Sequence, residues 1–416
     1  MNLLEREFCI DSRRVKPGCV FVAIKGERHD GHDFVREALE KGAEIAVVER
    51  PLGTGKEIVV DNVVNFLMEL ASEKMKAEIV IGVTGSSGKT FTKEVLHRLL
   101  PGSFRTHGNL NTEIGLPLSI LNGYSGEKIA ILEMGVDKPG DIRSLCRIVK
   151  PNVGVVLNVG RQHAGNFSSL EELFRAKMEM FECSETTVYN ADDGRMVDWI
   201  SRSGKKGKGF GKERGDCRLV DWRYSRKGTE AVYDVFGRAL YVSFKSALHE
   251  GHLLDIAASI CVLSSIGKGL DPEALSSVEP LNGRFKTIDI DGVRLIDDTY
   301  NASLGAFEVA IEAMMRMDGR RMAVVGPILE QGGLSRETHE RLSDILESLD
   351  GVFVLDGFEG SEYINPSNAV FRSESKDELA RAVIEEVRKG DIWLFKASRK
   401  VKMEEVFERV VDWLSR

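Results

Sequence analysis

The chain has 416 residues, of which 42% are hydrophobic and 29% are charged, and its formal net charge is -8. This length exceeds what one hydrophobic core usually supports, so we expect two or three domains in a folded, globular protein. The acidic balance opposes general binding to nucleic acid or to anionic membranes.

Signals for a membrane segment, a disulfide or a zinc site are weak. The first residues, MNLLEREFCIDSRR, mix acids and bases without an apolar segment, and no later run is long and apolar enough to span a bilayer. The six cysteines lie far apart and form no CxxC pair or Cys/His ligand spacing. We therefore expect a cytoplasmic monomer with free thiols.

Residues 1–77 read as a small α/β domain. Short β-like runs (FCIDS, CVFVAI, EIAVVE, EIVV) are interspersed with the helical patterns DFVREALEKGA and NVVNFLMELASEKM. The next region, 78–282, opens with a stronger pattern, in which the strand IVIGVT, the turn GSSGKT and the helix KTFTKEVLHRLL follow one another. Strand, glycine-rich turn and helix in this order form the usual context of a phosphate site.

Strands and helices continue to alternate through the middle of the chain. KIAILEMG and VGVVLNVG read as strands, PGDIRSLCRIV and SSLEELFRAKMEMF as helices. In the last helix either Ser168 with Glu171 or Ser169 with Glu172 supplies a capping box. The alternation predicts a largely parallel sheet with helices on both faces and ligands at the carboxyl ends of its strands.

Between Arg195 and Ser246 the pattern weakens into the stretch GKKGKGFGKERG, followed by the β-like segments CRLVDW, EAVYDVF and ALYVSF. We interpret this part as a β-rich excursion. Its basic side chains lack interleaved stacking aromatics beyond Phe210, which favours a solvated loop over an RNA site. These side chains are Arg202, Lys205, Lys206, Lys208, Lys212 and Arg214.

Residues 283–416 alternate again, from VRLIDD through RMAVVG, VFVLDG and IWLFKAS with helical patterns between them. This predicts a separate Rossmann-like domain, although no GxGxxG motif is present. The sequence thus predicts an α/β protein of three domains: a small N-terminal domain, a central P-loop-type parallel sheet and a C-terminal Rossmann-like domain.

The sharpest local motif is GVTGSSGKT. Backbone N–H groups of Gly85, Ser86, Ser87 and Gly88 can curl around phosphate oxygens. Lys89 adds a positive charge, and the Thr90 hydroxyl can bind Mg²⁺. The standard P-loop has glycine where this chain has Val83, so a glycine-rich turn with a solvated lysine is the alternative. The strand before the loop favours ATP binding.

The GxTGxxGKT form of this loop resembles that of the Mur ligase family and the related folylpolyglutamate synthases. Further segments in the same order extend the resemblance over nearly the whole chain. They are DSRRVKPGCVFVAIKGERHDGHDF, GNLNTEIGLPLSIL, EMGVDKPGDI, LNVGRQHAGNFSSLEELFRAK, YNADD, IDDTYNAS, VVGPILEQGG and FKASR. The resemblance implies a ligase that uses ATP to join a carboxylate to an amine through an acyl phosphate.

TYNAS and GPILEQGG resemble the branch of the family that adds D-alanyl-D-alanine to UDP-N-acetylmuramoyl-tripeptide in peptidoglycan synthesis. The DNPR signature of the branch that adds the third amino acid is absent. The resemblance therefore implies these two small-molecule substrates, with ATP and Mg²⁺. Pro327, Ile328 and Gln331 depart from the family's acceptor segment.

The resemblance also implies a metal site. Thr90, Glu133 and His163 match residues that bind Mg²⁺, and Lys177 matches a lysine that CO₂ carbamylates into a further metal or water ligand. From spacing alone, Glu133 would be an ordinary strand-end acid, His163 a loop histidine and Lys177 a solvated helix lysine.

Nucleotide contacts are implied at five positions of the second half. Arg284 matches an arginine that reaches the γ-phosphate, and Asp298 an aspartate that holds the ribose. Tyr300 and Asn301 occupy the nucleotide-facing turn, and Asp255 stands where the family has the asparagine that contacts adenine. From sequence alone, Arg284 is equally a linker arginine and 298–301 a helix-capping loop.

Substrate contacts are implied in three segments, with Ala397 replacing a family glycine in the last. The segment that resembles the family's uridine-diphosphate site lies near the N-terminus. The segment that resembles a UDP-sugar contact loop follows the phosphate-loop helix, and the one that resembles the dipeptide site lies near the C-terminus. The matched residues are Asp11, Ser12 and Arg13; Asn109, Asn111 and Thr112; and Lys396, Ser398 and Arg399.

Two other functions fit parts of the sequence. Another Mur-type or folylpolyglutamate-type amide ligase would share the acyl phosphate but use a different donor and acceptor. A catalytically silent UDP-sugar-binding regulator is suggested by Asp255 and by the altered GPILEQGG segment.

Overall fold

The computed structural model describes residues 2–26, 29–160, 167–225 and 227–416. The chain forms two compact units, of which the first comprises Met1–Cys217 with Ala258–Leu270 and the second Arg218–Ala257 with Asp271–Arg416. Among the described helices, none combines the length and apolarity needed to cross a membrane.

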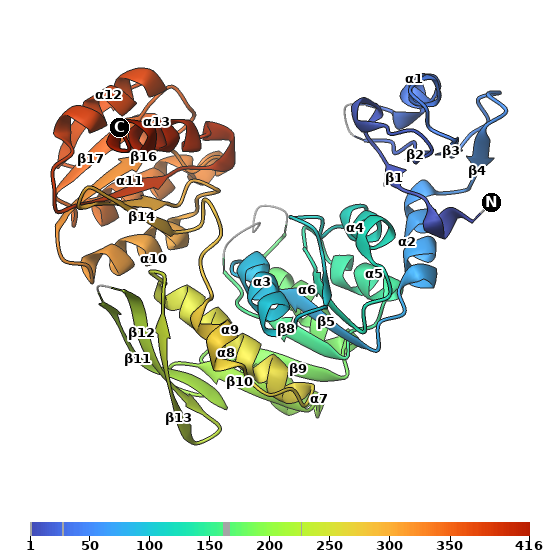
Figure 1. The fold of residues 1–416 in the computed structure, drawn as a ribbon, viewed down its shortest axis with the longest axis horizontal. Helices are drawn as coiled ribbons and strands as arrows, with labels where there is room; N and C mark the ends of the chain where they lie inside the picture. The colour runs from blue at the N-terminus through green and yellow to red at the C-terminus, as the bar shows by residue number, and fades with distance from the viewer. Residues whose placement is uncertain (1, 27–28, 161–166, 226) are drawn as a thin grey trace. The chain divides into compact units, whose positions relative to one another are not determined.

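The first unit begins with a parallel sheet in the order β1-β2-β3-β4 (Figure 1). Its strands are Phe8–Cys9, Val20–Val22, Ile45–Val48 and Glu57–Val59, and its helices α1 and α2 span Val35–Glu40 and Val63–Lys74. Buried apolar side chains fill β2 and β3, among them Phe21 in β2 and Val47 in β3, as the apolar runs predicted. Helix α2 lies beside helices α4 and α5 of the next sheet.

The first unit continues with parallel strands in the order β10-β9-β8-β5-β7-β6. Strands β5 to β10 span Ile79–Thr84, Phe104–Arg105, Ile129–Glu133, Val153–Val156, Thr186–Asn190 and Gly207–Gly211. Helices α3 to α7 span Lys89–Leu99, Gly115–Gly123, Asp141–Ile148, Leu170–Cys183 and Gly194–Ser203. Strands β5, β7 and β8 are adjacent, so the segments that follow them share one edge of the sheet.

The structure selects one of the two predicted capping boxes at the start of α6. Ser169 is the N-cap, and its hydroxyl accepts a hydrogen bond from the Glu172 N–H at 3.1 Å. The Glu172 carboxylate reaches back to the N–H and hydroxyl of Ser168, at 2.6 and 2.8 Å. Two polar groups that the first turn leaves open are thereby satisfied.

The glycine- and lysine-rich stretch is not the solvated loop that the sequence suggested. Strand β10 runs through its middle and pairs with β9. Glycine is required there by space, because a Cβ on Gly207 would lie 2.3 Å from Thr187 Oγ1. Lys208 on this strand donates a hydrogen bond to Ser264 Oγ at 2.5 Å. The basic cluster is therefore partly a structural element of the sheet.

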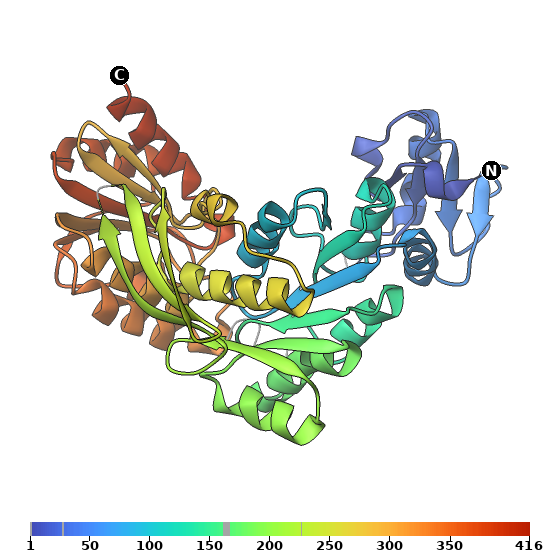
Figure 2. The same cartoon turned by 60° about the horizontal axis from the view of Figure 1, so that its bottom comes forward.

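The predicted β-rich excursion is present as β11 (Cys217–Ser225), β12 (Gly228–Val235) and β13 (Arg238–Phe244). Strands β12 and β13 are antiparallel, and in Figure 2 the yellow-green strands form a long, twisted ribbon. Helices α8 (Glu250–Ser265) and α9 (Pro272–Ser276) follow.

The C-terminal sheet has the order β14-β15-β19-β16-β17-β18, and only β14 is antiparallel to its neighbour. Its strands are Lys286–Ile290, Val293–Asp297, Arg320–Val325, Gly351–Leu355, Ala369–Ser373 and Asp391–Lys396. Helices α10 to α13 span Leu304–Met315, Ser335–Leu346, Lys376–Glu386 and Glu404–Leu414. The last strand, β19, inserts between β15 and β16, which brings the segments after these three strands together.

Candidate functional site

The phosphate loop lies between β5 and α3, as the sequence predicts. Gly88 is the N-cap of α3 and has a φ of 85°, a left-handed conformation that favours glycine. No side chain caps the helix, so the first N–H groups of α3 point out of its N-terminus. An open helix N-terminus with a glycine-rich approach is suited to an anion.

Lys89 and Thr90 are the first two residues of this helix, and both are half-buried. The Lys89 ammonium bends back over the loop and donates hydrogen bonds to the carbonyls of Gly85 at 2.7 Å and Ser86 at 3.3 Å. A positive charge is thus held above the backbone turn that the sequence assigned to phosphate.

Asn158, just after β8, braces the loop and was not predicted from the sequence. Its Oδ1 accepts a hydrogen bond from the Ser87 N–H at 2.9 Å, and its Nδ2 donates to the Ser87 carbonyl at 3.2 Å. Ser86 is tied to the same segment, because its hydroxyl accepts from the Gly160 N–H at 2.9 Å. The sequence feature that could have indicated this role is an amide side chain just after a strand that neighbours β5.

Replacing Asn158 with alanine should loosen the phosphate loop. Three hydrogen bonds between the Asn158 side chain and Ser87 are lost, each worth about 1 kcal/mol. We expect the KM for ATP to rise by about tenfold, since about 1.4 kcal/mol corresponds to a factor of ten. Steady-state kinetics with varied ATP test this; an unchanged KM would show that the loop does not depend on Asn158. Asn152→Ala, next to β8 at its other end, is the control.

Glu133 ends β7, next to the phosphate-loop strand, and is only 2% exposed. Its Oε1 accepts from Asn111 Nδ2 at 2.8 Å, and its N–H donates to Thr106 Oγ1 at 2.7 Å. Oε2 is buried and has no hydrogen-bond partner among the described residues. A buried carboxylate oxygen without a hydrogen bond suits a cation, and the Lys93 ammonium lies 3.8 Å from it.

Asn111 brings the predicted substrate loop to Glu133. In that loop Asn109 and Thr112 are exposed, and the Thr112 hydroxyl accepts a hydrogen bond from the Gly115 N–H at 3.2 Å, at the start of α4. His163, the other predicted metal ligand, lies outside the described residues.

Lys177 lies on α6 and is 1% exposed, so it is not a solvated helix lysine. Burial lowers the pKa of Lys177 to about 7, with a further lowering by the charge of Lys89 and an opposing contribution from Asp137. The side chain is therefore an amine that is substantially neutral near pH 7, within electrostatic reach of the phosphate-loop lysine.

The residues predicted to bind uridine diphosphate lie in or next to a short 3-10 helix, η2 (Ser12–Arg14). Asp11 caps it, and Arg13 donates two side-chain hydrogen bonds to the Asp11 carboxylate at 2.9 and 2.8 Å, which lowers the pKa of Asp11 to about 2. Ser12 is buried and donates to Glu37 at 3.3 Å. The Arg13 side chain is exposed, and its guanidinium is paired with the Asp11 carboxylate.

In the second unit, Asp298 follows β15 and Lys396 ends β19, so the two lie at one sheet edge. The Lys396 ammonium is 2.6 Å from Asp298 Oδ2 and donates to the Asn301 carbonyl at 3.1 Å. Burial raises the pKa of Asp298, and Lys396 opposes that rise. The Phe285 N–H donates to Asp298 Oδ1 at 3.1 Å, which fixes the carboxylate from a second side.

Most of the other predicted residues of this unit adjoin the pair. The Tyr300 ring has the guanidinium of Arg284 at 4.1 Å and that of Arg399 at 5.6 Å from its centre. Ser398 is buried, and its hydroxyl accepts from the Leu329 N–H at 2.9 Å, which joins the FKASR and GPILEQGG segments. The sheet edge thus collects residues predicted to contact nucleotide and dipeptide.

Asp255 is buried on α8, and burial raises its pKa well above the usual value. His249 and His252 stack their rings 3.7 Å apart at the start of the same helix, and burial lowers the pKa of His249 to about 3. Burial thus favours the protonated form of the Asp255 carboxyl, and that form can donate as well as accept a hydrogen bond.

Replacing Lys396 with methionine should destabilise the protein by about 3 kcal/mol, because it leaves the Asp298 carboxylate buried without its partner. Protonation of Asp298 limits the loss, so the deficit should shrink as the pH falls. Denaturant unfolding tests this. The control is Lys400→Met, which removes an ion pair with Glu330 in which both side chains are more than 70% exposed. Equal stability of the two variants would contradict the expectation.

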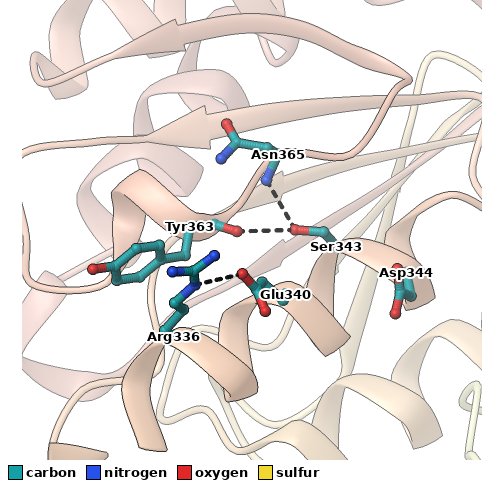
Figure 3. A pocket seen from close by; sticks show the side chains of 6 residues that line it. All are labelled: Arg336, Glu340, Ser343, Asp344, Tyr363 and Asn365. Atoms are coloured by element: carbon teal, nitrogen blue, oxygen red, sulfur yellow. Dashed lines mark hydrogen bonds and ion pairs between the residues drawn. The ribbon is translucent and has the colours of Figure 1, made fainter. Parts of the chain in front are cut away.

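A shallow hollow elsewhere in the second unit contains none of the predicted site residues (Figure 3). Arg336 and Glu340 on its wall pair with each other at 2.7 Å, and the Ser343 hydroxyl bonds the backbone of Tyr363 and Asn365. The polar groups of Arg336, Glu340 and Ser343 are therefore paired within the protein. We assign no binding function to this hollow.

The phosphate loop at the carboxyl edge of a parallel sheet defines the chain as a nucleotide-binding α/β protein. Residues 7–83 match the model described as Mur ligase family, catalytic domain, residues 83–252 the Mur ligase middle domain, and residues 283–399 the Mur ligase, glutamate ligase domain. The chain belongs to the Mur ligase family.

Several relatives match the chain over nearly its full length. The UDP-N-acetylmuramoyl-tripeptide--D-alanyl-D-alanine ligase of Bacillus subtilis is 31% identical over 97% of this chain and 92% of its own. The ligase of that name from Escherichia coli is 30% identical over 95% and 91%. The crystal structure of MurF ligase from Thermotoga maritima in complex with ADP is 42% identical, with a TM-score of 0.94 over 100% of this chain and 99% of that one.

Proposed function

We propose that the chain is an ATP-dependent ligase that adds D-alanyl-D-alanine to UDP-N-acetylmuramoyl-tripeptide in peptidoglycan precursor synthesis. The observation that carries this proposal is the phosphate loop with Lys89 above it, in a chain that is 30–31% identical over nearly its full length to enzymes of this name. Because the phosphoryl donor is ATP, we place the reaction in the cytoplasm.

The chemistry requires activation of a carboxylate, which is a poor electrophile toward an amine. The terminal carboxylate of the tripeptide attacks the γ-phosphorus of ATP, releasing ADP and forming an acyl phosphate. The dipeptide amine then adds to the acyl carbon and loses a proton, and inorganic phosphate leaves as the amide forms. Such phosphoryl transfer depends on positioning and on cations above the developing negative charge, which Lys89 supplies.

The residues at the phosphate-loop edge fit Mg²⁺. The Thr90 hydroxyl and the open Oε2 of Glu133 would hold the ion, together with His163 on the family resemblance. Mg²⁺ would supply charge neutralisation for the phosphates.

Lys177 fits the carbamylated lysine that the resemblance implies. CO₂ adds only to a neutral amine, and burial keeps this amine substantially neutral near pH 7. The resulting carbamate would carry a negative charge within electrostatic reach of Lys89.

The remaining assignments rest on the resemblance and on the clustering described above. We assign uridine-diphosphate and UDP-sugar binding to Asp11, Ser12, Arg13, Asn109, Asn111 and Thr112. We assign nucleotide binding to Asp255, Arg284, Asp298, Tyr300 and Asn301, and dipeptide binding to Lys396, Ser398 and Arg399.

An acceptor panel tests the proposal. The protein, ATP, Mg²⁺ and UDP-N-acetylmuramoyl-tripeptide are incubated with D-alanyl-D-alanine, meso-diaminopimelate or glutamate, and the products are identified by mass spectrometry. A pentapeptide product formed only with the dipeptide is expected. Turnover with another amine, on its own donor, would assign the chain to a different amide ligase, and binding of the precursor without ADP formation would indicate a silent binder.

A further inference from the structure

One buried cation near the phosphate loop has no role in the chemistry above. Lys93 lies on α3, four residues after Lys89, and its side chain is 0% exposed. Lysine is rarely buried to this extent unless its ammonium is fully partnered.

The Lys93 ammonium joins three parts of the first unit. It donates hydrogen bonds to the carbonyls of Thr106 at 2.8 Å and Gly108 at 2.9 Å. It lies 3.4 Å from Glu94 Oε1 and 3.8 Å from Glu133 Oε2, the carboxylate oxygen that lacks a hydrogen bond. Three ammonium protons thus meet two carbonyls and two carboxylates.

Both carbonyls belong to the segment 106–112, which also contacts Glu133. Asn111 of this segment donates to Glu133 Oε1, and the Gly135 N–H donates to the Asn111 carbonyl at 2.8 Å. The phosphate-loop helix, the segment 106–112 and the carboxylate are therefore connected through one side chain. Burial lowers the pKa of Lys93, and Glu133 and Glu94 act against this by favouring the charged form.

We propose that Lys93 is a positioning residue that holds the segment 106–112 and Glu133 in register with the phosphate loop, so that binding of the UDP-linked substrate depends on it. The identity of that substrate rests on the proposed function; the anchoring of the segment does not. Without the ammonium, two carbonyls and one carboxylate oxygen lose the buried cation that they share, and the segment must turn toward water.

The test compares Lys93→Met with Lys74→Met in the full chain. Lys74 is a partly buried lysine of the same unit whose ammonium also donates to a backbone carbonyl, that of Leu121 at 2.5 Å, outside the segment 106–112. Amide hydrogen exchange without ligands should be at least tenfold faster in residues 106–112 of Lys93→Met and unchanged there in Lys74→Met. In Lys93→Gln, which keeps a side-chain N–H donor, the exchange rate of residues 106–112 should lie between those of the wild type and Lys93→Met. This variant replaces Lys93→Met in the test if the methionine variant does not fold.

Kinetics separate positioning from a general loss of stability. In Lys93→Met we expect the KM for UDP-N-acetylmuramoyl-tripeptide and the Mg²⁺ concentration for half-maximal rate to rise at least tenfold, with the KM for D-alanyl-D-alanine within twofold of wild type. Unchanged exchange in 106–112, or a lower melting temperature with unchanged KM values, would overturn the proposal. If the wild type shows no dipeptide-dependent turnover, the proposed function fails and the exchange comparison still decides the anchoring.

Discussion

Replacing Lys89 with alanine should lower kcat for dipeptide-dependent phosphate release by at least about 100-fold, the usual effect of removing one preorganised charge donor from a transition state. The Lys89 ammonium is held above the phosphate loop by the carbonyls of Gly85 and Ser86. Alanine keeps the helix and removes the charge, so the fold should persist. Steady-state phosphate release with saturating substrates measures the loss.

The matched control is Lys128→Ala, which removes an exposed lysine at the other end of the sheet, paired with Glu78 at 3.1 Å. It should leave kcat unchanged. A Lys89 variant that releases phosphate at the wild-type rate would mean that the loop does not carry the phosphoryl transfer.

Replacing Lys177 with methionine should lower kcat by about 100-fold or more, because the negatively charged carbamate that we propose at this lysine can no longer form. Wild-type activity should also fall as the pH drops below about 7, the pKa to which burial lowers Lys177, since the ammonium form cannot add CO₂. Above about 7 the amine is neutral and carbamate formation is favoured, so activity supported by added bicarbonate should rise with pH through this range.

Carbon-13 NMR with labelled bicarbonate tests the same lysine without turnover. One carbamate signal should appear in the wild type, disappear in Lys177→Met and remain in Lys205→Met. Lys205 is the control because its ammonium donates to the Glu182 and Ser184 carbonyls at the end of α6 and has no part in the site. A signal that persists in Lys177→Met would place the carbamate elsewhere.

The local parts of the site could be predicted from the sequence. The geometry of GVTGSSGKT could be predicted because its strand, glycine-rich turn and helix are contiguous in the sequence. The position of Glu133 could be predicted because it follows a clear apolar run. The partners of these residues could not be predicted, because they come from adjacent strands far away in the chain. Asn158 contacts Ser87 across 71 residues, and whether Lys93 points inward depends on where segment 106–112 lies.

In the fold as well, local features could be predicted from the sequence and features that depend on distant segments could not. The apolar strands β5, β7, β8, β15, β16, β17 and β19 were predicted. The edge strands β6, β14 and β18 were not, since an edge strand needs no continuous apolar run, and the inner strand β9 was also missed. Strand β10 was missed because glycine and lysine have low β propensity. Its glycines are explained by close neighbours from other segments: a Cβ on Gly207 would meet Thr187, one on Gly209 would meet Ala191, and one on Gly211 would meet Asp192 and the Arg214 carbonyl.

The measurement that tests the central claim most directly is phosphate release from ATP in the presence of UDP-N-acetylmuramoyl-tripeptide, with and without D-alanyl-D-alanine. We predict release that requires both substrates, with one ADP and one phosphate for each amide formed. Release that is indifferent to the dipeptide, or none with both substrates present, would contradict the assignment of this chain as the ligase that adds D-alanyl-D-alanine.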